Sequence, residues 1–201
     1  MRTPPLGVAM DYDVLILAGG EAKRFGYVDK CMFNYLGKPI LFRLLEEFDD
    51  AYVVSRHKRN LSKGVEIIET GKREGPLGGV KVSLPYLTKA KVFITGCDYP
   101  FVCRRLTDYM CKDNYDITMV LTDDVQPLLG CYMVDFLKNY VNRVRALREL
   151  LHFAKSIKFV GLYELRFLDP ELKFLVNVNT LQDFAWNSNI KVYTIGKIIL
   201  K

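Results

Sequence analysis

The sequence predicts an α/β domain of three layers, in which helices cover both faces of a mainly parallel sheet. Short apolar runs rich in β-branched residues alternate with segments of helical spacing, and this alternation is typical of parallel sheets. The first such run covers residues 13–17 and is followed by two consecutive glycines, Gly19 and Gly20. A chain of 201 residues can bury a core of its own, so we expect a single domain over 1–201 with a loose tail at 1–11.

The first half of the chain continues the alternation. Apolar side chains at positions 40, 41, 44, 45 and 48 recur at helical spacing, and Pro39 suits the first turn of a helix over 40–48. Four glycines in residues 70–79 predict a flexible loop that approaches a ligand, followed by a helix over 80–87. The segments expected to be extended here are 31–36, 51–55 and 65–69.

In the second half, the clearest strand covers residues 91–95 and runs directly into Gly96-Cys97-Asp98. A carboxylate at the carboxyl end of a parallel strand lies at the edge where α/β sheets bind ligands. Helices are expected over 101–110, over most of 135–154 and from Thr180 onward, where Thr180 and Asp183 resemble a capping box. The remaining segments expected to be extended are 116–121, 127–134, 157–168 and 190–200.

Composition narrows the class of protein. The formal net charge of +6 suits anionic partners such as nucleotides, although surface lysines alone could account for it. The twelve Phe and twelve Tyr residues are scattered through expected strands and helices, so they favour core packing over nucleic-acid binding. No apolar run reaches about 18 residues, and we expect no membrane segment, no signal peptide and a cytoplasmic location. The start could be Met1 or Met10.

Five cysteines are an odd number, and no two of them are spaced as CxxC. This pattern supports neither a disulfide framework nor a zinc knuckle. With two histidines in the chain, a His/Cys metal cluster is also not expected. We therefore expect reduced thiols.

The glycine turn is followed by two cations, Arg24 and Lys30, at a spacing that lets both fold back over it. Consecutive glycines let backbone amides approach a ligand closely. A strand, a glycine turn and two cations together form an arrangement suited to a polyphosphate. The alternative is an ordinary turn with two solvated cations.

The order of several short segments resembles that of a known family. Residues 17–30, LAGGEAKRFGYVDK, are similar to the signature of the nucleoside-diphosphate-sugar pyrophosphorylase-like nucleotidyltransferases, and within them to the molybdenum cofactor guanylyltransferases. Four later segments resemble the same family in the same order: LGKP at 36–39, GPLGG at 75–79, CDYPF at 97–101 and NVNT at 177–180. The resemblance implies a Rossmann-like twisted sheet of the nucleotide-diphospho-sugar transferase type.

The resemblance also implies an activity: Mg²⁺-dependent transfer of GMP from GTP to the phosphate of a molybdopterin-type Mo or W cofactor, with release of pyrophosphate. Three side chains would carry the chemistry. Arg24 would hold the β- and γ-phosphates, and Lys30 would lie near the α-phosphate and its developing charge. Asp98 would bind Mg²⁺, which prefers hard oxygen ligands. The alternative for Asp98 is a helix N-cap after the strand.

Nucleotide and acceptor would bind on opposite sides of these residues. The family typically recognises the nucleotide with an Asn and an Asp, where this chain offers Ser55 or Arg56 and then Glu69 with Thr70. The acceptor would lie against Asn177, Asn179 and Arg143. The positions expected to bind the nucleotide are Leu17, Ala18, Gly19, Gly20, Lys30, Ser55, Glu69, Thr70, Pro76, Leu77, Gly78 and Asp98.

Two alternatives stay open. The same chemistry could use another nucleotide or acceptor, such as CTP with molybdopterin, or GTP with a cobamide precursor or phospholactate. The chain could instead be a non-catalytic protein that delivers cofactor, and transient contact with molybdoenzymes or tungstoenzymes is possible in either case. Asn177 and Asn179 speak against cytidylyl transfer, because the resembling cytidylyltransferases usually carry acidic residues there. Retention of Arg24, Lys30 and Asp98 speaks against lost chemistry.

Overall fold

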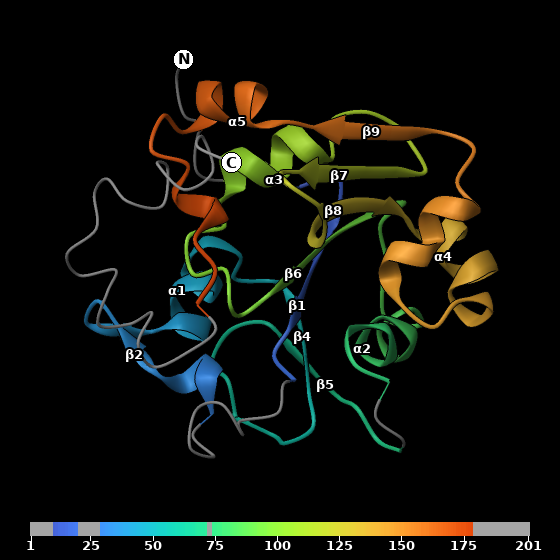
Figure 1. The fold of residues 1–201 in the computed structure, drawn as a ribbon. Coiled ribbons are helices and arrows are strands. Elements are labelled where there is room, and N and C mark those ends of the chain that lie inside the picture. The colour runs from blue at the N-terminus through green and yellow to red at the C-terminus, as the bar shows by residue number, and fades with distance from the viewer. Residues whose placement is uncertain (1–9, 20–28, 72–73, 179–201) are drawn as a thin grey trace.

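A seven-stranded sheet forms the centre of the molecule, with the strand order β5-β4-β1-β6-β8-β7-β9 (Figure 1). The computed structural model describes residues 10–19, 29–71 and 74–178. Neighbouring strands are parallel, except that β8 is antiparallel to both β6 and β7. The prediction of a mainly parallel α/β sheet is therefore confirmed. The strands are β1 (Asp13–Leu17), β4 (Tyr52–Ser55), β5 (Val65–Ile68), β6 (Lys91–Gly96), β7 (Ile117–Leu121), β8 (Val125–Met133) and β9 (Ile157–Val160).

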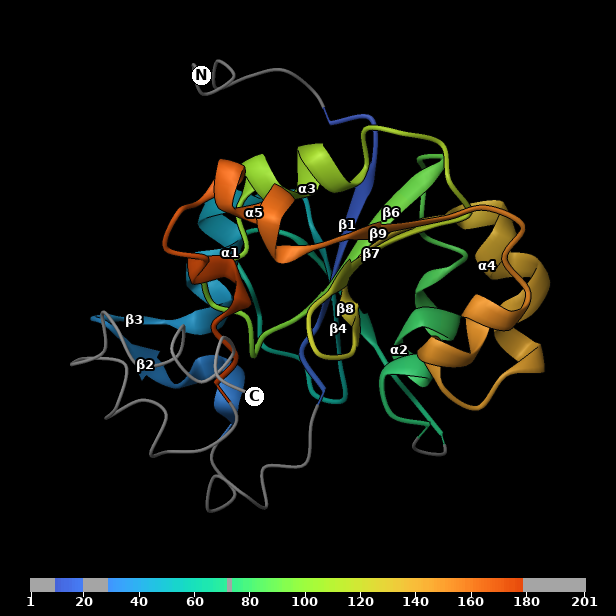
Figure 2. The same ribbon diagram turned by 45° about the horizontal axis from the view of Figure 1, so that its top comes forward.

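Helices cover both faces of this sheet, as Figures 1 and 2 show. One face carries α1 (Ile40–Glu47), α3 (Arg104–Met110) and α5 (Leu162–Leu168). The other carries α2 (Pro76–Ser83), α4 (Val134–Tyr140) and the 3₁₀ turns η3 (Val141–Arg143) and η4 (Leu147–His152). The smaller elements are η2 (Lys30–Met32), the hairpin of β2 (Asn34–Tyr35) and β3 (Lys38–Pro39), and η5 (Lys173–Leu175).

Strand β1 is apolar throughout because both of its faces are covered. Val14 and Ile16 pack in the cluster that contains α1, α3 and α5. Leu15 and Leu17 point to the opposite face and pack with α2 and α4. A strand buried on both sides has no need for polar residues on alternate positions, which explains the unbroken apolar run.

The prediction of a loop over 70–79 is wrong for residues 76–79, which belong to a helix. Helix α2 begins at Pro76, which occupies the first helical turn, so Gly78 and Gly79 belong to a helix. A Cβ atom at Gly79 would lie 2.8 Å from Cδ2 of Leu17, closer than packed side chains permit. The glycine lets α2 approach β1 without a shift of the Leu17 side chain, and it lies within a helix and not in a flexible loop.

The prediction of an extended segment over 157–168 is also wrong beyond Val160, because the chain forms helix α5 from Leu162. Tyr163, Leu165 and Phe167 alternate along the sequence in a way that is typical of a strand. In the helix, Leu165 is buried, whereas the exposed rings of Tyr163 and Phe167 meet edge to face with centroids 5.1 Å apart. The backbone amide of Gly161, the N-cap residue, donates to the Glu164 carboxylate at 3.3 Å.

The other elements differ less from their predicted bounds. The helix expected over 101–110 begins at Arg104, the segment expected over 135–154 is α4 followed by two 3₁₀ turns, and the piece expected over 31–36 begins as the turn η2. Residues 1–9 and 179–201, and with them most of the expected tail and the last helix, lie outside the described residues. Within the described ranges, no helix combines the length and apolar character needed to cross a bilayer.

The core positions of α1 provide a test of the packing. Leu44 is fully buried, whereas Phe42 on the same helix is 40% exposed. Truncation of Leu44 to Ala should lower the free energy of unfolding by about 2–5 kcal/mol, because a cavity remains. Phe42→Ala, as the matched control, should change it by about 0.5 kcal/mol or less. Urea denaturation measures both, and equal losses would contradict the assignment of this face.

Candidate active site

The carboxyl ends of β1 and β6 bring two predicted segments together. The strands pair in parallel with Leu17 opposite Gly96, and the Cys97 amide donates to the Leu17 carbonyl oxygen at 3.3 Å. On the other side, the Ala18 amide donates to the carbonyl oxygen of Val54 at 2.8 Å. The residues that follow β1 and β6 therefore lie at one edge of the sheet, as the sequence predicts.

Lys30 and Asp98 face each other at this edge. The Lys30 Nζ atom lies 3.8 Å from Oδ2 of Asp98, and the two side chains are 24% and 18% exposed. Helix α3 begins after Cys103, so Asp98 does not cap it. The alternative of a helix N-cap is thereby removed, and the carboxylate stands beside a cation where a ligand can reach both.

Asn177 completes this group from the far end of the described chain. Its Nδ2 atom donates to Asp98 Oδ2 at 3.3 Å, and the Val178 amide donates to the Asp98 carbonyl oxygen at 2.8 Å. The Asn177 Oδ1 atom is buried and has no hydrogen-bond partner among the described residues. Beside them, the Tyr99 hydroxyl donates to Gln126 Oε1 at 3.2 Å, and burial raises the pKa of Tyr99. An unsatisfied amide oxygen next to a carboxylate offers a hard ligand pair.

A disulfide joins the two halves of the same edge. Cys31, next to Lys30, is bonded to Cys97, next to Asp98, and both sulfur-bearing side chains are buried. The expectation of reduced thiols is therefore wrong for this pair, because the fold brings together two residues that are 66 positions apart in the chain. A second disulfide, away from this edge, joins Cys111 to Cys131, so the expectation is wrong for this pair too, and Cys103 is free.

Glu69 lies on the other side of β1, between two glycines. A Cβ atom built on Gly78 would be 2.3 Å from Glu69 Oε1, and one built on Gly19 would be 3.8 Å from Oε2. The carboxylate thus occupies the space that a methyl group at position 78 would fill. This geometry links the acid at position 69, where the family typically has Asp, to the glycine at 78.

Ser55 and Thr70, the other two residues expected to recognise the nucleotide, differ in burial. Ser55 is buried, and its hydroxyl donates to the carbonyl oxygen of His57 at 2.6 Å, so its proton is used within its own loop. Thr70 is exposed in the segment that follows β5. Glu69 is therefore the one of the three whose polar atoms lie against the glycine backbone.

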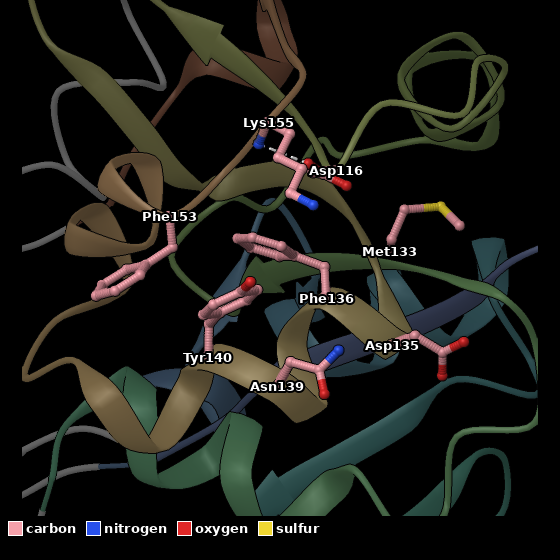
Figure 3. A pocket seen from close by; sticks show the side chains of 8 residues that line it. All are labelled: Asp116, Met133, Asp135, Phe136, Asn139, Tyr140, Phe153 and Lys155. Atoms are coloured by element: carbon pink, nitrogen blue, oxygen red, sulfur yellow. Dashed lines mark hydrogen bonds between the residues drawn. The ribbon is translucent and has the colours of Figure 1, made fainter.

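One hollow adjoins predicted site residues, and a second lies near Met133, which pairs with Lys91 at the end of β6 opposite to the site. Pro76 and Leu77, both predicted to bind the nucleotide, line the first, of about 370 Å³, together with Arg145 and Arg148. The second hollow, of about 240 Å³, is lined in part by three rings, of which Tyr140 stacks on Phe153 and lies tilted against Phe136, and by none of the predicted site residues (Figure 3).

Two of the predicted acceptor residues, Arg143 and Asn177, are not brought together. Arg143 lies over the Tyr140 ring at 5.3 Å, and its neighbours Val141 and Val144 pack in the cluster with α2. The chain that leads to Asn177 packs instead in the cluster with α1 and α3. Three predicted residues, Gly20, Arg24 and Asn179, lie outside the described residues.

One contact was missed by sequence reasoning. Arg59, in the basic segment between β4 and β5, donates from Nη2 to the Ala18 carbonyl oxygen at 3.0 Å and to the Asp29 carboxylate at 2.7 Å. Several cations occupy this segment, so no spacing distinguishes the one that folds inward. The structure adds Arg59 to the residues around the site.

Together, a mainly parallel sheet covered by helices and a Lys–Asp pair at the carboxyl ends of β1 and β6 are typical of a nucleotidyltransferase of the α/β class. The family described as "MobA-like NTP transferase domain" matches residues 14–157, and the chain belongs to this family. The resemblance found in the sequence is thereby confirmed.

Curated relatives and solved structures agree with this assignment. A probable molybdenum cofactor guanylyltransferase of Methanosarcina acetivorans is 26% identical over 194 residues, covering 84% of this chain and 86% of the relative. The molybdenum cofactor guanylyltransferase of Syntrophotalea carbinolica is 26% identical, with coverages of 85% and 87%. The solved structure of molybdopterin-guanine dinucleotide biosynthesis protein A from Archaeoglobus fulgidus has a TM-score of 0.73 at 22% identity, with coverages of 86% and 95%.

The fold extends to enzymes with another nucleotide in their names. The 2-C-methyl-D-erythritol 4-phosphate cytidylyltransferase from Thermus thermophilus has a TM-score of 0.63 at 16% identity, covering 88% of this chain and 96% of that one. Such likeness supports the fold alone and does not distinguish between nucleotides.

The two disulfides make a matched pair of tests. By loop length, removal of the Cys31–Cys97 bond (C31S/C97S) should lower the free energy of unfolding by roughly 4 kcal/mol, and C111S/C131S by roughly 3 kcal/mol. Since Cys31 and Cys97 adjoin Lys30 and Asp98, the first double variant alone should also lower nucleotidyl transfer per folded molecule. Denaturation and activity assays measure the two effects. Equal activity losses in both variants would show that the bond at the site has no special role.

Proposed function

We propose that this protein transfers GMP from GTP to the phosphate of a molybdopterin-type cofactor and releases pyrophosphate. The observation that carries the proposal is the group formed by Lys30, Asp98 and Asn177 at the carboxyl edge of β1 and β6. The names of the curated relatives support the choice of acceptor.

The chemistry asks for charge stabilisation at the α-phosphate. An oxygen of the acceptor phosphate forms a bond to the α-phosphorus, the bond from that phosphorus to the bridging oxygen of the β-phosphate breaks, and pyrophosphate leaves. Lys30 stabilises the negative charge that develops during this exchange, and Arg24 is proposed to hold the departing phosphates. Most of the rate gain in such a reaction comes from positioning and electrostatics.

Mg²⁺ is the proposed cofactor, and the residues present are suited to it. Within the described ranges there is no cluster of three or more His, Cys, Asp or Glu side chains that could hold a metal by themselves. Mg²⁺ is commonly held by one or two carboxylates together with substrate phosphates. Asp98 and the unpartnered Oδ1 of Asn177 would supply the protein ligands. When bound, the ion would neutralise charge on the phosphates.

Glu69 supports guanine as the base. Guanine presents N1–H and N2–H₂ side by side on one edge, and a single carboxylate can accept from both because it is a pure acceptor. Cytosine and adenine each place a ring-nitrogen acceptor next to their amino group, which would face the carboxylate unfavourably. The position of Glu69 between Gly19 and Gly78 suits a base held against the backbone.

The acceptor side is proposed to include Asn177 and Asn179, without Arg143. Neutral amides can hydrogen-bond an anionic phosphate or a pterin edge without repulsion. Arg143 is left out because it packs on Tyr140 beside the α2 cluster. Arg145 and Arg148 line the hollow next to Pro76 and Leu77, so they are better placed to meet an anion near the nucleotide.

Pyrophosphate release tests the reaction. Purified protein with GTP, Mg²⁺ and molybdopterin-type cofactor should release pyrophosphate, whereas omission of the acceptor or addition of EDTA should stop it. Asp98→Asn removes the charged metal ligand and should lower kcat by at least about 100-fold, in line with the loss of one transition-state interaction. Asp113→Asn, which alters an exposed partner of Lys158, is the control. Absence of release from wild type with competent acceptor would refute the substrate assignment.

The role of Glu69 in choosing the base can be tested separately. Glu69→Gln should raise the Kd for GTP by roughly 10- to 100-fold, since hydrogen bonds to a charged group contribute about 1.5–3 kcal/mol. Gly78→Ala should also weaken GTP binding, because the new methyl group displaces the carboxylate, and E69D/G78A should restore it. Thermal shift with GTP, CTP and ATP measures the preference. Stronger stabilisation by CTP than by GTP in wild type would favour cytidylyl transfer instead.

A further inference from the structure

Arg59 is a buried cation that touches both ends of the segment between β1 and η2. Its side chain is 9% exposed. Nη2 donates to the Ala18 carbonyl oxygen at 3.0 Å and to Oδ2 of Asp29 at 2.7 Å, and Nε donates to the same Oδ2 at 3.0 Å. One guanidinium therefore joins the residue that follows β1 to the residue that precedes Lys30.

The backbone around Arg59 is fixed from a different direction. Glu66, on β5, accepts hydrogen bonds from the amides of Arg59 at 2.6 Å and Leu61 at 3.2 Å. Since β5 pairs with β4, and β4 with β1, this anchor belongs to the sheet. Because its backbone is anchored to the sheet, Arg59 holds the Asp29 carboxylate at a fixed place relative to the sheet edge.

Asp29 in turn fixes the start of η2, the turn that contains Lys30. Its Oδ1 atom accepts from the Cys31 amide at 3.0 Å and caps the turn η2, while its Oδ2 atom is held by Arg59. Lys30 is the first residue of that turn, and its Nζ lies 3.8 Å from Asp98. A displacement of Asp29 would therefore move the ammonium group that faces the carboxylate.

Stability alone explains Arg59 poorly. Its Nη1 atom is buried and has no hydrogen-bond partner among the described residues. Buried donors without partners cost free energy, which an apolar side chain of similar size would avoid. The contacts that Arg59 makes at the site offer a reason for keeping it.

We propose that Arg59 is a positioning residue for the nucleotidyl transfer, which sets Lys30 and the Ala18–Gly19 backbone in place for the nucleotide. The inference rests on the function proposed above. Arginine suits this role because its planar group can bond a carboxylate and a carbonyl oxygen at once, a geometry that the ammonium group of lysine does not reproduce.

A double-mutant cycle between Arg59 and Asp29 tests the proposal. Arg59→Met should lower kcat by roughly 10- to 100-fold with little change in KM for GTP, because a small misplacement of a catalytic group costs rate. Asp29→Asn should lower kcat as well, and R59M/D29N should be close to R59M alone, since both act through one contact. Lys58→Met removes an exposed charge from the same loop and should leave kcat unchanged.

Arg59→Lys keeps the charge if Arg59→Met does not fold. It should have near wild-type thermal stability and still show a reduced kcat. A wild-type kcat in a folded Arg59 variant would overturn the proposal, as would strictly additive losses in the cycle, and either result would leave the proposed function standing. If wild type itself releases no pyrophosphate from any nucleotide, the proposed function and the role of Arg59 fail together.

Discussion

The parallel pairing of β1 with β6 is the interaction on which the rest of the structure depends. It places Leu17 beside Gly96, so the segments that leave the two strands start at the same edge. Both strands are buried on each face, and the helices of both layers pack against them. A shift of register by one residue would exchange the two faces of β1 and separate Lys30 from Asp98, so core packing and site geometry are fixed together.

Hydrogen bonds to uncharged groups and a disulfide hold the Asp98 carboxylate in place. Asp98 is tied to the chain near Asn177 by backbone and side-chain hydrogen bonds, and to Lys30 through the disulfide of their neighbours. Preorganised groups of this kind need little rearrangement when a charged ligand arrives. Disulfides persist in oxidising compartments and also inside the cells of hyperthermophiles, so both settings are compatible with the two bonds.

Much of the fold could be predicted from the sequence because local pattern and tertiary environment agree there. Strand β1 and helix α1 are bounded as their apolar spacing indicates. Helix α5 could not be predicted, because Tyr163 and Phe167 are aromatic yet exposed and imitate the alternation of a strand. Motif order assigned Lys30 and Asp98 to one candidate site. Their contact, the disulfide partners and the inward turn of Arg59 depend on contacts between distant residues, for which a single sequence carries no signal.

The antiparallel strand β8 has a consequence for the order in which the protein is assembled. It lies between β6 and β7 in the sheet but follows β7 in the chain, so β7 leaves the ribosome before the strand that attaches it. Among the described strands, β7 is connected to β6 only through β8, and β9 pairs with β7 at the edge of the sheet. Lys30, Glu69 and Asp98 are thus synthesised well ahead of Asn177. Translation separates in time two side chains, Asp98 and Asn177, whose polar atoms the fold brings to 3.3 Å.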